Sequence, residues 1–192
     1  MPKPNVRHKL LAAGLRTLHD RGFNATSIQD ITDSAAVPKG SFYNHFKSKE
    51  ALGAEIVQVY SRQNRERLIA LRDPGEAPLR RLRAYFESLL ALTREDDFQC
   101  GCLLGNFGNE LSVQSDLIRQ RVAGALNSWT GALAKTIAEA QEDGTIGDDQ
   151  PPEQLAAFLI NAWQGALMRA KVERSDKPLT AFLRIMETRI LV

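Results

Sequence analysis

The stretch that decides the fold of this 192-residue chain is AVPKGSFYNHFKSKEAL, residues 36–52. Pro38 lacks an amide hydrogen and disfavours helical geometry at the residue before it, so it interrupts one helix and can start the next. In the helix expected over residues 39–46, only Phe42 and Phe46, which are four residues apart, can face a core. The outward side chains are small, polar or cationic, which is typical of a surface that makes hydrogen bonds.

A second short helix precedes this stretch. Thr26 or Ser27 caps it, Asp30 is the capping-box acid, and Ile28 and Ile31 lie on its buried face. Two short helices joined by a tight turn match a helix-turn-helix, whose second helix enters the major groove of DNA. That groove is about 12 Å wide, so residues near the start of the entering helix must be small or able to form hydrogen bonds.

The candidate DNA-binding residues lie in and around these two helices, and they are Thr26, Ser27, Lys39, Gly40, Ser41, Tyr43, Asn44, His45, Lys47 and Lys49. Lys39 can contact a phosphate or a guanine, and Asn44 can form a bidentate pair of hydrogen bonds with adenine. Tyr43 can pack on a thymine methyl group or bind a phosphate. Lys47 and Lys49 would position the DNA backbone.

The rest of the chain also has helical periodicity, and no run alternates with period two over the length of a strand. We therefore expect an all-α protein. The expected helix-turn-helix domain covers residues 1–50, and a long helix from residue 48 to about 71 joins it to a helical bundle within residues 51–192. Further helices are expected over residues 5–20, 78–93, 102–111, 115–142, 151–172 and 178–191.

Composition agrees with a globular cytoplasmic protein that binds no membrane. The chain is 43% hydrophobic and 25% charged, and no stretch approaches the roughly 18 consecutive apolar residues of a membrane span. Its two cysteines, one residue apart, give no disulfide framework and indicate a reducing compartment. Residues 1–50 hold 8 Lys or Arg against 4 Asp or Glu, so the N-terminal quarter is basic.

Three segments resemble the N-terminal domain of TetR-type transcriptional repressors: Gly22 with Phe23, TSIQDI at residues 26–31, and AVPKGSFYNHFKSKEAL at residues 36–52. The sequence departs from that family at Ala36, where glycine is usual. The resemblance implies a homodimer that binds a double-stranded DNA operator, and a ligand-binding and dimerisation domain that responds to a small-molecule inducer. It also implies a phosphate contact for His45, for which a hydrogen bond to a local carbonyl is the alternative.

Cys100 and Cys102 have several interpretations. A zinc site needs about four ligands, and a disulfide across one residue is strained, so we expect neither of them at these cysteines. We expect no metal and no other cofactor in this protein. Cys102 starts an expected helix, where partial positive charge favours a reactive thiolate, although a free cysteine also serves as a small buried hydrophobe. Residues 101–110 and 165–171 resemble the N-ethylmaleimide repressor subgroup, which implies an electrophile or redox sensor at Cys102, with Cys100 as a weaker candidate.

The same resemblance places Lys171 near enough to stabilise a Cys102 thiolate, and a solvated lysine is the alternative. Phe86, Phe107, Trp129 and Trp163 fall on apolar helix faces, so they either line an inducer pocket or form plain core. The faces that suit a dimer interface, or internal packing, carry Ala157, Gly165, Ala166, Phe182, Ile185 and Met186. An enzyme using Cys102 as nucleophile lacks a histidine base in the same domain, so we expect no enzyme.

Overall fold

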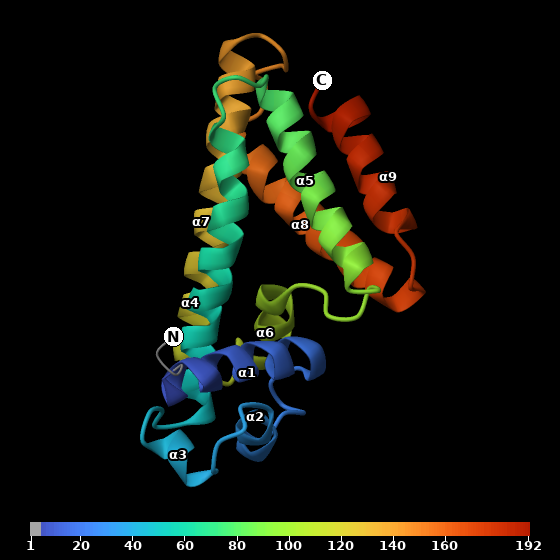
Figure 1. Cartoon of the computed structure of the whole chain (residues 1–192). Coiled ribbons are helices and arrows are strands. Elements are labelled where there is room, and N and C mark those ends of the chain that lie inside the picture. The colour runs from blue at the N-terminus through green and yellow to red at the C-terminus, as the bar shows by residue number, and fades with distance from the viewer. Residues whose placement is uncertain (1–4) are drawn as a thin grey trace. The chain divides into compact units, whose positions relative to one another are not determined.

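The computed structural model describes residues 5–192, which form helices and short connections without a strand (Figure 1). The predicted all-α fold is confirmed. The helices are α1 (Val6–Arg21), α2 (Ile28–Ser34), α3 (Gly40–Tyr43), α4 (Lys49–Arg67), α5 (Pro78–Glu95), α6 (Leu103–Leu111), α7 (Asp116–Glu142), α8 (Pro152–Glu173) and α9 (Lys177–Ile185). Over the described residues, no helix combines the length and the apolar character that crossing a membrane requires.

The chain divides into two compact units, each built from two stretches of sequence. The first unit combines the residues up to 62 with residues 102–125, and the second combines residues 63–101 with residues 126–192. Helices α4 and α7 each begin in the first unit and end in the second. Helix α6 belongs to the first unit, although it follows α5 of the second unit along the chain.

Local signals fix the ends of α1 and α2. The side chain of Asn5 accepts a backbone hydrogen bond of 3.0 Å at the start of α1, and Gly22 ends the helix with a φ of 83°, which glycine adopts without steric cost. Of the two predicted caps, Ser27 starts α2: its hydroxyl accepts from the Asp30 amide at 3.1 Å, and the Asp30 carboxylate accepts from the Ser27 amide at 2.7 Å. Hydrogen bonds from the Ser27 side chain and backbone hold the pKa of Asp30 below its ordinary value.

The first unit closes around an apolar core to which α1, α2, α3 and α4 all contribute. Its fully buried side chains include Leu10, Leu18, Ile31, Phe42, Leu52 and Ile56. Phe46 is 3% exposed and its ring centroid lies 5.7 Å from that of Phe42. Regular α3 is shorter than predicted because the amides of His45 and Phe46 both donate to the Phe42 carbonyl, which closes the last turn.

The second unit has an aromatic core. Phe86 on α5, Trp163 on α8 and Phe182 on α9 pack together with ring centroids 4.9–5.3 Å apart. Tyr85 extends this cluster to Trp129 on α7, with centroids 6.4 Å apart. Helix α9 packs against both α8 and α5 (Figure 1).

Two predicted helices end earlier than expected. Helix α4 stops at Arg67 and continues as a 3-10 helix over Leu68–Arg72. The Leu71 carbonyl is bound by two side chains, the buried guanidinium of Arg81 at 2.6 Å and the Thr136 hydroxyl at 3.3 Å. Helix α9 likewise gives way to a π-helical turn over Met186–Ile190.

The capping box at the start of α2 can be tested by mutation. Ser27→Ala should lower the free energy of unfolding by about 1 kcal/mol, because the Asp30 amide loses its acceptor. Urea unfolding followed by circular dichroism measures the change. Gln58→Ala, at an exposed position of α4, is the control and should stay within about 0.5 kcal/mol of wild type. Equal stability of the two variants would contradict the capping role.

Candidate functional site

The turn between α2 and α3 reverses the chain as a helix-turn-helix requires. The Val37 amide donates to the Thr32 carbonyl at 3.1 Å, and the Ser41 amide donates to the Pro38 carbonyl at 2.9 Å. Ala36 has a φ of 52°, in the left-handed region, where a residue with a side chain costs roughly 1–2 kcal/mol. Alanine at this position therefore adopts the conformation that glycine adopts more easily, and the turn is intact.

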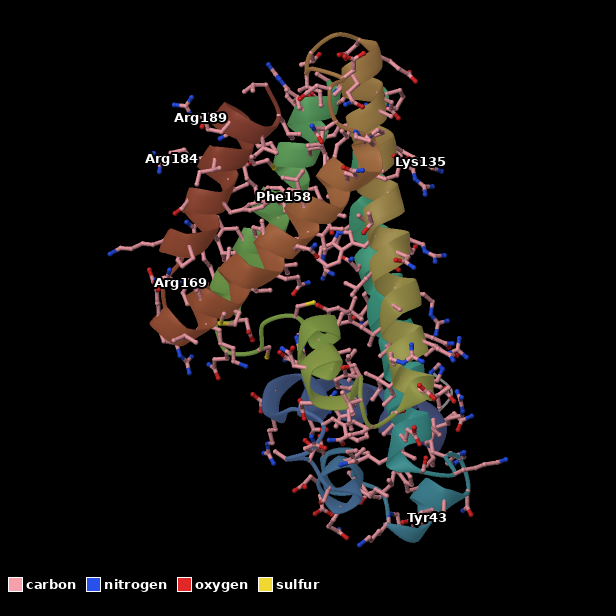
Figure 2. The ribbon with its side chains drawn as sticks, turned by 180° about the vertical axis from the view of Figure 1, so that it is seen from behind. Tyr43, Lys135, Phe158, Arg169, Arg184 and Arg189 are labelled. Atoms are coloured by element: carbon pink, nitrogen blue, oxygen red, sulfur yellow. The ribbon has the colours of Figure 1, made fainter. Side chains whose placement is uncertain are left out.

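Helix α3 buries its apolar side and presents its polar side outward. Tyr43 is 58% exposed and projects from the helix (Figure 2). The other exposed candidates are Lys39, Gly40, Asn44 and Lys47, while Ser41 and His45 are half-buried. A Cβ atom placed on Gly40 would have no heavy atom within 4 Å. The start of α3 is thus open to close approach by another molecule.

Two candidates precede α2, and the structure separates them. Thr26 is 1% exposed, and its hydroxyl donates to the carbonyls of Gly22 at 2.8 Å and Thr17 at 3.3 Å. The Thr26 side chain is therefore buried and bonded inside the unit, and its contact with DNA stays a prediction. Ser27 is exposed, with its hydroxyl at the cap of α2.

Lys49 also has its partners inside the first unit. Its ammonium donates to the carbonyls of Phe23 at 2.9 Å and Thr26 at 2.7 Å, and it lies 4.3 Å from the centroid of the Phe23 ring. Burial lowers the pKa of Lys49, and the nearby negative charge of Glu110 opposes that shift. Lys49 thus bonds to backbone carbonyls of its own unit, and its predicted phosphate contact stays a prediction.

The two cysteines have different surroundings. Cys102 is the N-cap of α6 and is 6% exposed, and the Tyr60 hydroxyl lies 3.8 Å from its sulfur. Cys100 is half-buried; its amide donates to the Asp96 carboxylate at 2.6 Å and its thiol at 3.2 Å. Cys102 belongs to the first unit and Cys100 to the second. The expected helix start at Cys102 is present.

The remaining sensor candidates lie in both units. Lys171, on α8, is half-buried and donates to the Cys100 carbonyl at 3.4 Å, so it is not a fully solvated lysine. Phe86, Trp129 and Trp163 are at most 5% exposed, in the core of the second unit. Phe107, in the first unit, packs edge-to-face on Phe23 with centroids 5.7 Å apart.

An apolar groove lies between α8 and α9. Its volume is about 540 Å³, and its lining includes Phe158, Gly165, Ala166, Phe182, Ile185 and Met186. All but Phe158 were predicted to lie on faces that suit a dimer. Phe158 is 52% exposed and Ile185 46% exposed. The labels Phe158 and Arg169 locate α8 in Figure 2. Arg184 lies on α9, and Arg189 lies in the π-helical turn that follows it.

Both parts of the chain match a known family. Residues 10–56 match the bacterial regulatory proteins of the tetR family. Residues 78–186 match the tetracyclin repressor-like C-terminal domain. The chain belongs to the TetR family. The predicted resemblance is confirmed, and the helix-turn-helix is its DNA-binding part.

Relatives of similar length support the assignment. The HTH-type transcriptional repressor DhaR of Mycobacterium sp. (strain GP1) is 42% identical, over 97% of this chain and 92% of its own length. The crystal structure of a regulatory protein TetR from Rhodobacter sphaeroides superposes with a TM-score of 0.90 at 34% identity, covering 96% of this chain and 98% of that chain. This TetR-family protein is a DNA-binding transcriptional regulator with a ligand-binding C-terminal domain and not an enzyme.

The subgroup resemblance rests on a more distant relationship. The repressor NemR of Escherichia coli is 30% identical, over 91% of this chain and 88% of its own length. The crystal structure of its reduced form has a TM-score of 0.85 at 27% identity and covers 97% of each chain. These figures support the family, and sensing by Cys102 stays a prediction.

Glu110, at the end of α6, was not identified from the sequence. Its carboxylate accepts hydrogen bonds from the backbone amides of Phe23 at 3.2 Å and Asn24 at 2.8 Å. The partners are 87 and 86 residues away along the chain. No local pattern marks such a contact.

The outward face of α3 can be tested on an operator selected in vitro from random duplexes. Lys39→Ala should weaken binding and reduce the slope of log affinity against log salt by about one, because one phosphate contact is lost. Tyr43→Ala should weaken binding with a smaller change of slope. Fluorescence anisotropy over a salt series measures both.

The control for this test is Lys135→Ala, an exposed lysine on α7 in the second unit (Figure 2). It removes the same charge and should change neither affinity nor slope. Identical behaviour of the Lys39 and Lys135 variants would exclude α3 from the DNA contact.

Proposed function

We propose that this TetR-family regulator is a homodimeric repressor that binds a palindromic operator and is released by a small-molecule or electrophilic inducer. The observation that carries the proposal is the outward face of α3, where exposed Lys39, Tyr43 and Asn44 surround the open position Gly40. Because its partner is DNA, the protein works in the cytoplasm of a bacterial cell.

Each exposed residue has a role that suits its chemistry. Asn44 and Ser41 have groups that hydrogen-bond to base edges, and Tyr43 can pack on a thymine methyl group. Lys39, Lys47, His45 and the cap at Ser27 face phosphates, which position the protein without selecting sequence. In a symmetric dimer, two copies of α3 lie about 34–36 Å apart, one helical turn of DNA, and bind the two halves of the operator.

A second copy of the chain is the proposed occupant of the groove between α8 and α9. A two-fold interface uses the same surface on both subunits, and a second copy would cover the exposed Phe158 and Ile185 of the groove lining. Contiguous apolar surface of this kind marks an interaction site. Family membership supports the same use, because regulators of this type typically dimerise.

The dimer can be tested with Ile185→Glu, which introduces a charge into the groove. We expect dissociation to monomers in sedimentation velocity, because the carboxylate would lose its hydration at the interface. Binding to the selected palindromic operator should fall by at least about tenfold, since one half-site is lost. Thr180→Glu, at an exposed position of α9 outside the groove lining, is the control. A dimeric Ile185→Glu protein would exclude this face as the interface.

Cys102 is the proposed site of electrophile sensing. Cys102 is almost fully buried at the start of α6, so a group attached to its sulfur cannot be accommodated without moving its neighbours. With N-ethylmaleimide, the thiolate adds to the carbon–carbon double bond of the ring. A sulfur–carbon bond forms, the π bond breaks, and the neighbouring carbon takes a proton from water.

Alkylation should release the operator from wild type and from Cys100→Ser, and not from Cys102→Ser. A tenfold loss of affinity corresponds to about 1.4 kcal/mol in favour of the released conformer. Mobility shift before and after N-ethylmaleimide, with mass spectrometry to count adducts, measures the effect. Release that persists in Cys102→Ser would eliminate Cys102 as the sensor and favour a reversible small-molecule inducer.

A further inference from the structure

The turn between α1 and α2 is bound on two sides by charged side chains from other helices. Glu110 of α6 accepts hydrogen bonds from the amides of Phe23 and Asn24, at 3.2 and 2.8 Å. Lys49 of α4 donates to the carbonyls of Phe23 and Thr26, at 2.9 and 2.7 Å. Hydrogen bonds to ionised groups are shorter and stronger than neutral ones, so these four contacts restrain the turn.

The contact with Glu110 is close and has little free space. A Cβ atom on Gly22 would lie 2.6 Å from one carboxylate oxygen of Glu110. The φ of Gly22 is 83°, so a side chain here would also be strained. Phe107, one turn before Glu110 on α6, packs edge-to-face on Phe23. Helix α6 thus contacts the turn through one charged and one aromatic side chain.

The turn leads directly into the helix-turn-helix. Thr26 is followed by Ser27, the cap of α2, and α2 leads through Ala36 into α3. Because α2 and α3 are short, their orientation depends on what holds them at their ends. We infer that Glu110 is a positioning residue for operator binding: its carboxylate fixes the α1–α2 turn and, through it, the helix that enters DNA.

Helix α6 also carries the proposed sensor, and this extension rests on the proposed function. Helix α6 has nine residues, Leu103–Leu111. Cys102 is its N-cap, and Glu110 lies in its last turn. Such a helix is about 13 Å long and moves as one piece. A group added to Cys102 that shifts α6 therefore pulls the Glu110 carboxylate away from the Phe23 and Asn24 amides.

The first test measures operator affinity, and the direction of its change on mutation separates positioning from simple electrostatics. Removing a carboxylate from a DNA-binding unit should strengthen binding on electrostatic grounds alone. We expect the opposite for Glu110→Ala, a loss of about tenfold or more, and a smaller loss for Glu110→Gln, whose amide oxygen still accepts one hydrogen bond. Asp20→Asn removes the same charge from an exposed position close to the turn and should bind as tightly as wild type or more tightly.

Amide hydrogen exchange separates positioning from a loss of folding. In wild type the amides of Phe23 and Asn24 should be protected, and in Glu110→Ala both should exchange faster while the core amide of Ile31 keeps its protection. If Glu110→Ala does not fold, the same comparison is made with Glu110→Gln. A folded variant with exposed Phe23 and Asn24 amides that binds the operator like wild type would overturn the inference.

The response to N-ethylmaleimide gives the second test. If α6 acts through Glu110, alkylation should weaken operator binding by a smaller factor in Glu110→Ala than in wild type. The reason is that the variant already lacks the hydrogen bonds from the Phe23 and Asn24 amides to Glu110. An equal factor in both proteins would overturn the extension to sensing. A wild type that does not respond to alkylation would instead refute the proposed sensor, and the affinity test of Glu110 would stand by itself.

Discussion

The orientation of α3 depends on the burial of two phenylalanine rings. A helix of four residues is not stable alone, because nucleation fixes several dihedrals for one hydrogen bond. Phe42 and Phe46 are buried, and each ring contributes roughly 1.5–3 kcal/mol by leaving water. Since both rings lie on the inner side, the residues between and before them face outward. The surface of α3 proposed to bind DNA is therefore the side opposite the one that packs on the core.

The first unit uses charge to hold backbone as well as to bind DNA. Lys49 and Glu110 both bond to the short turn after α1, one to its carbonyls and one to its amides. Neighbouring Glu50 accepts a hydrogen bond from Ser115 at the start of α7. These half-buried and exposed charges thus have partners within the unit, whereas Lys39 and Lys47 are exposed beside α3.

The chain passes between its two units at three points: within α4, within α7, and between Gly101 and Cys102. A repressor that responds to a ligand must bias one conformer over another, and the ligand can do so only through contacts that differ between conformers. Cys102 lies at the third of these points, and its role as a sensor stays a prediction.

Local spacing in the sequence was sufficient for much of this protein. The turn at Pro38, the four-residue interval between Phe42 and Phe46, the Ser27 cap with Asp30 and the stop at Gly22 could all be predicted. Capping, proline geometry and helical periodicity act within a few residues, so their signals are local. The same local run of residues carried the resemblance to the TetR family, and with it the function.

The tertiary structure alone decided what the distant side chains do. A threonine near a helix start has the same local pattern whether it faces DNA or the protein interior, and Thr26 is buried. A lysine is equally suited to a phosphate and to a carbonyl, and Lys49 bonds to Phe23 and Thr26, 26 and 23 residues away. Only packing brings α6 against the turn after α1, because a hydrogen bond depends on distance in space and not along the chain.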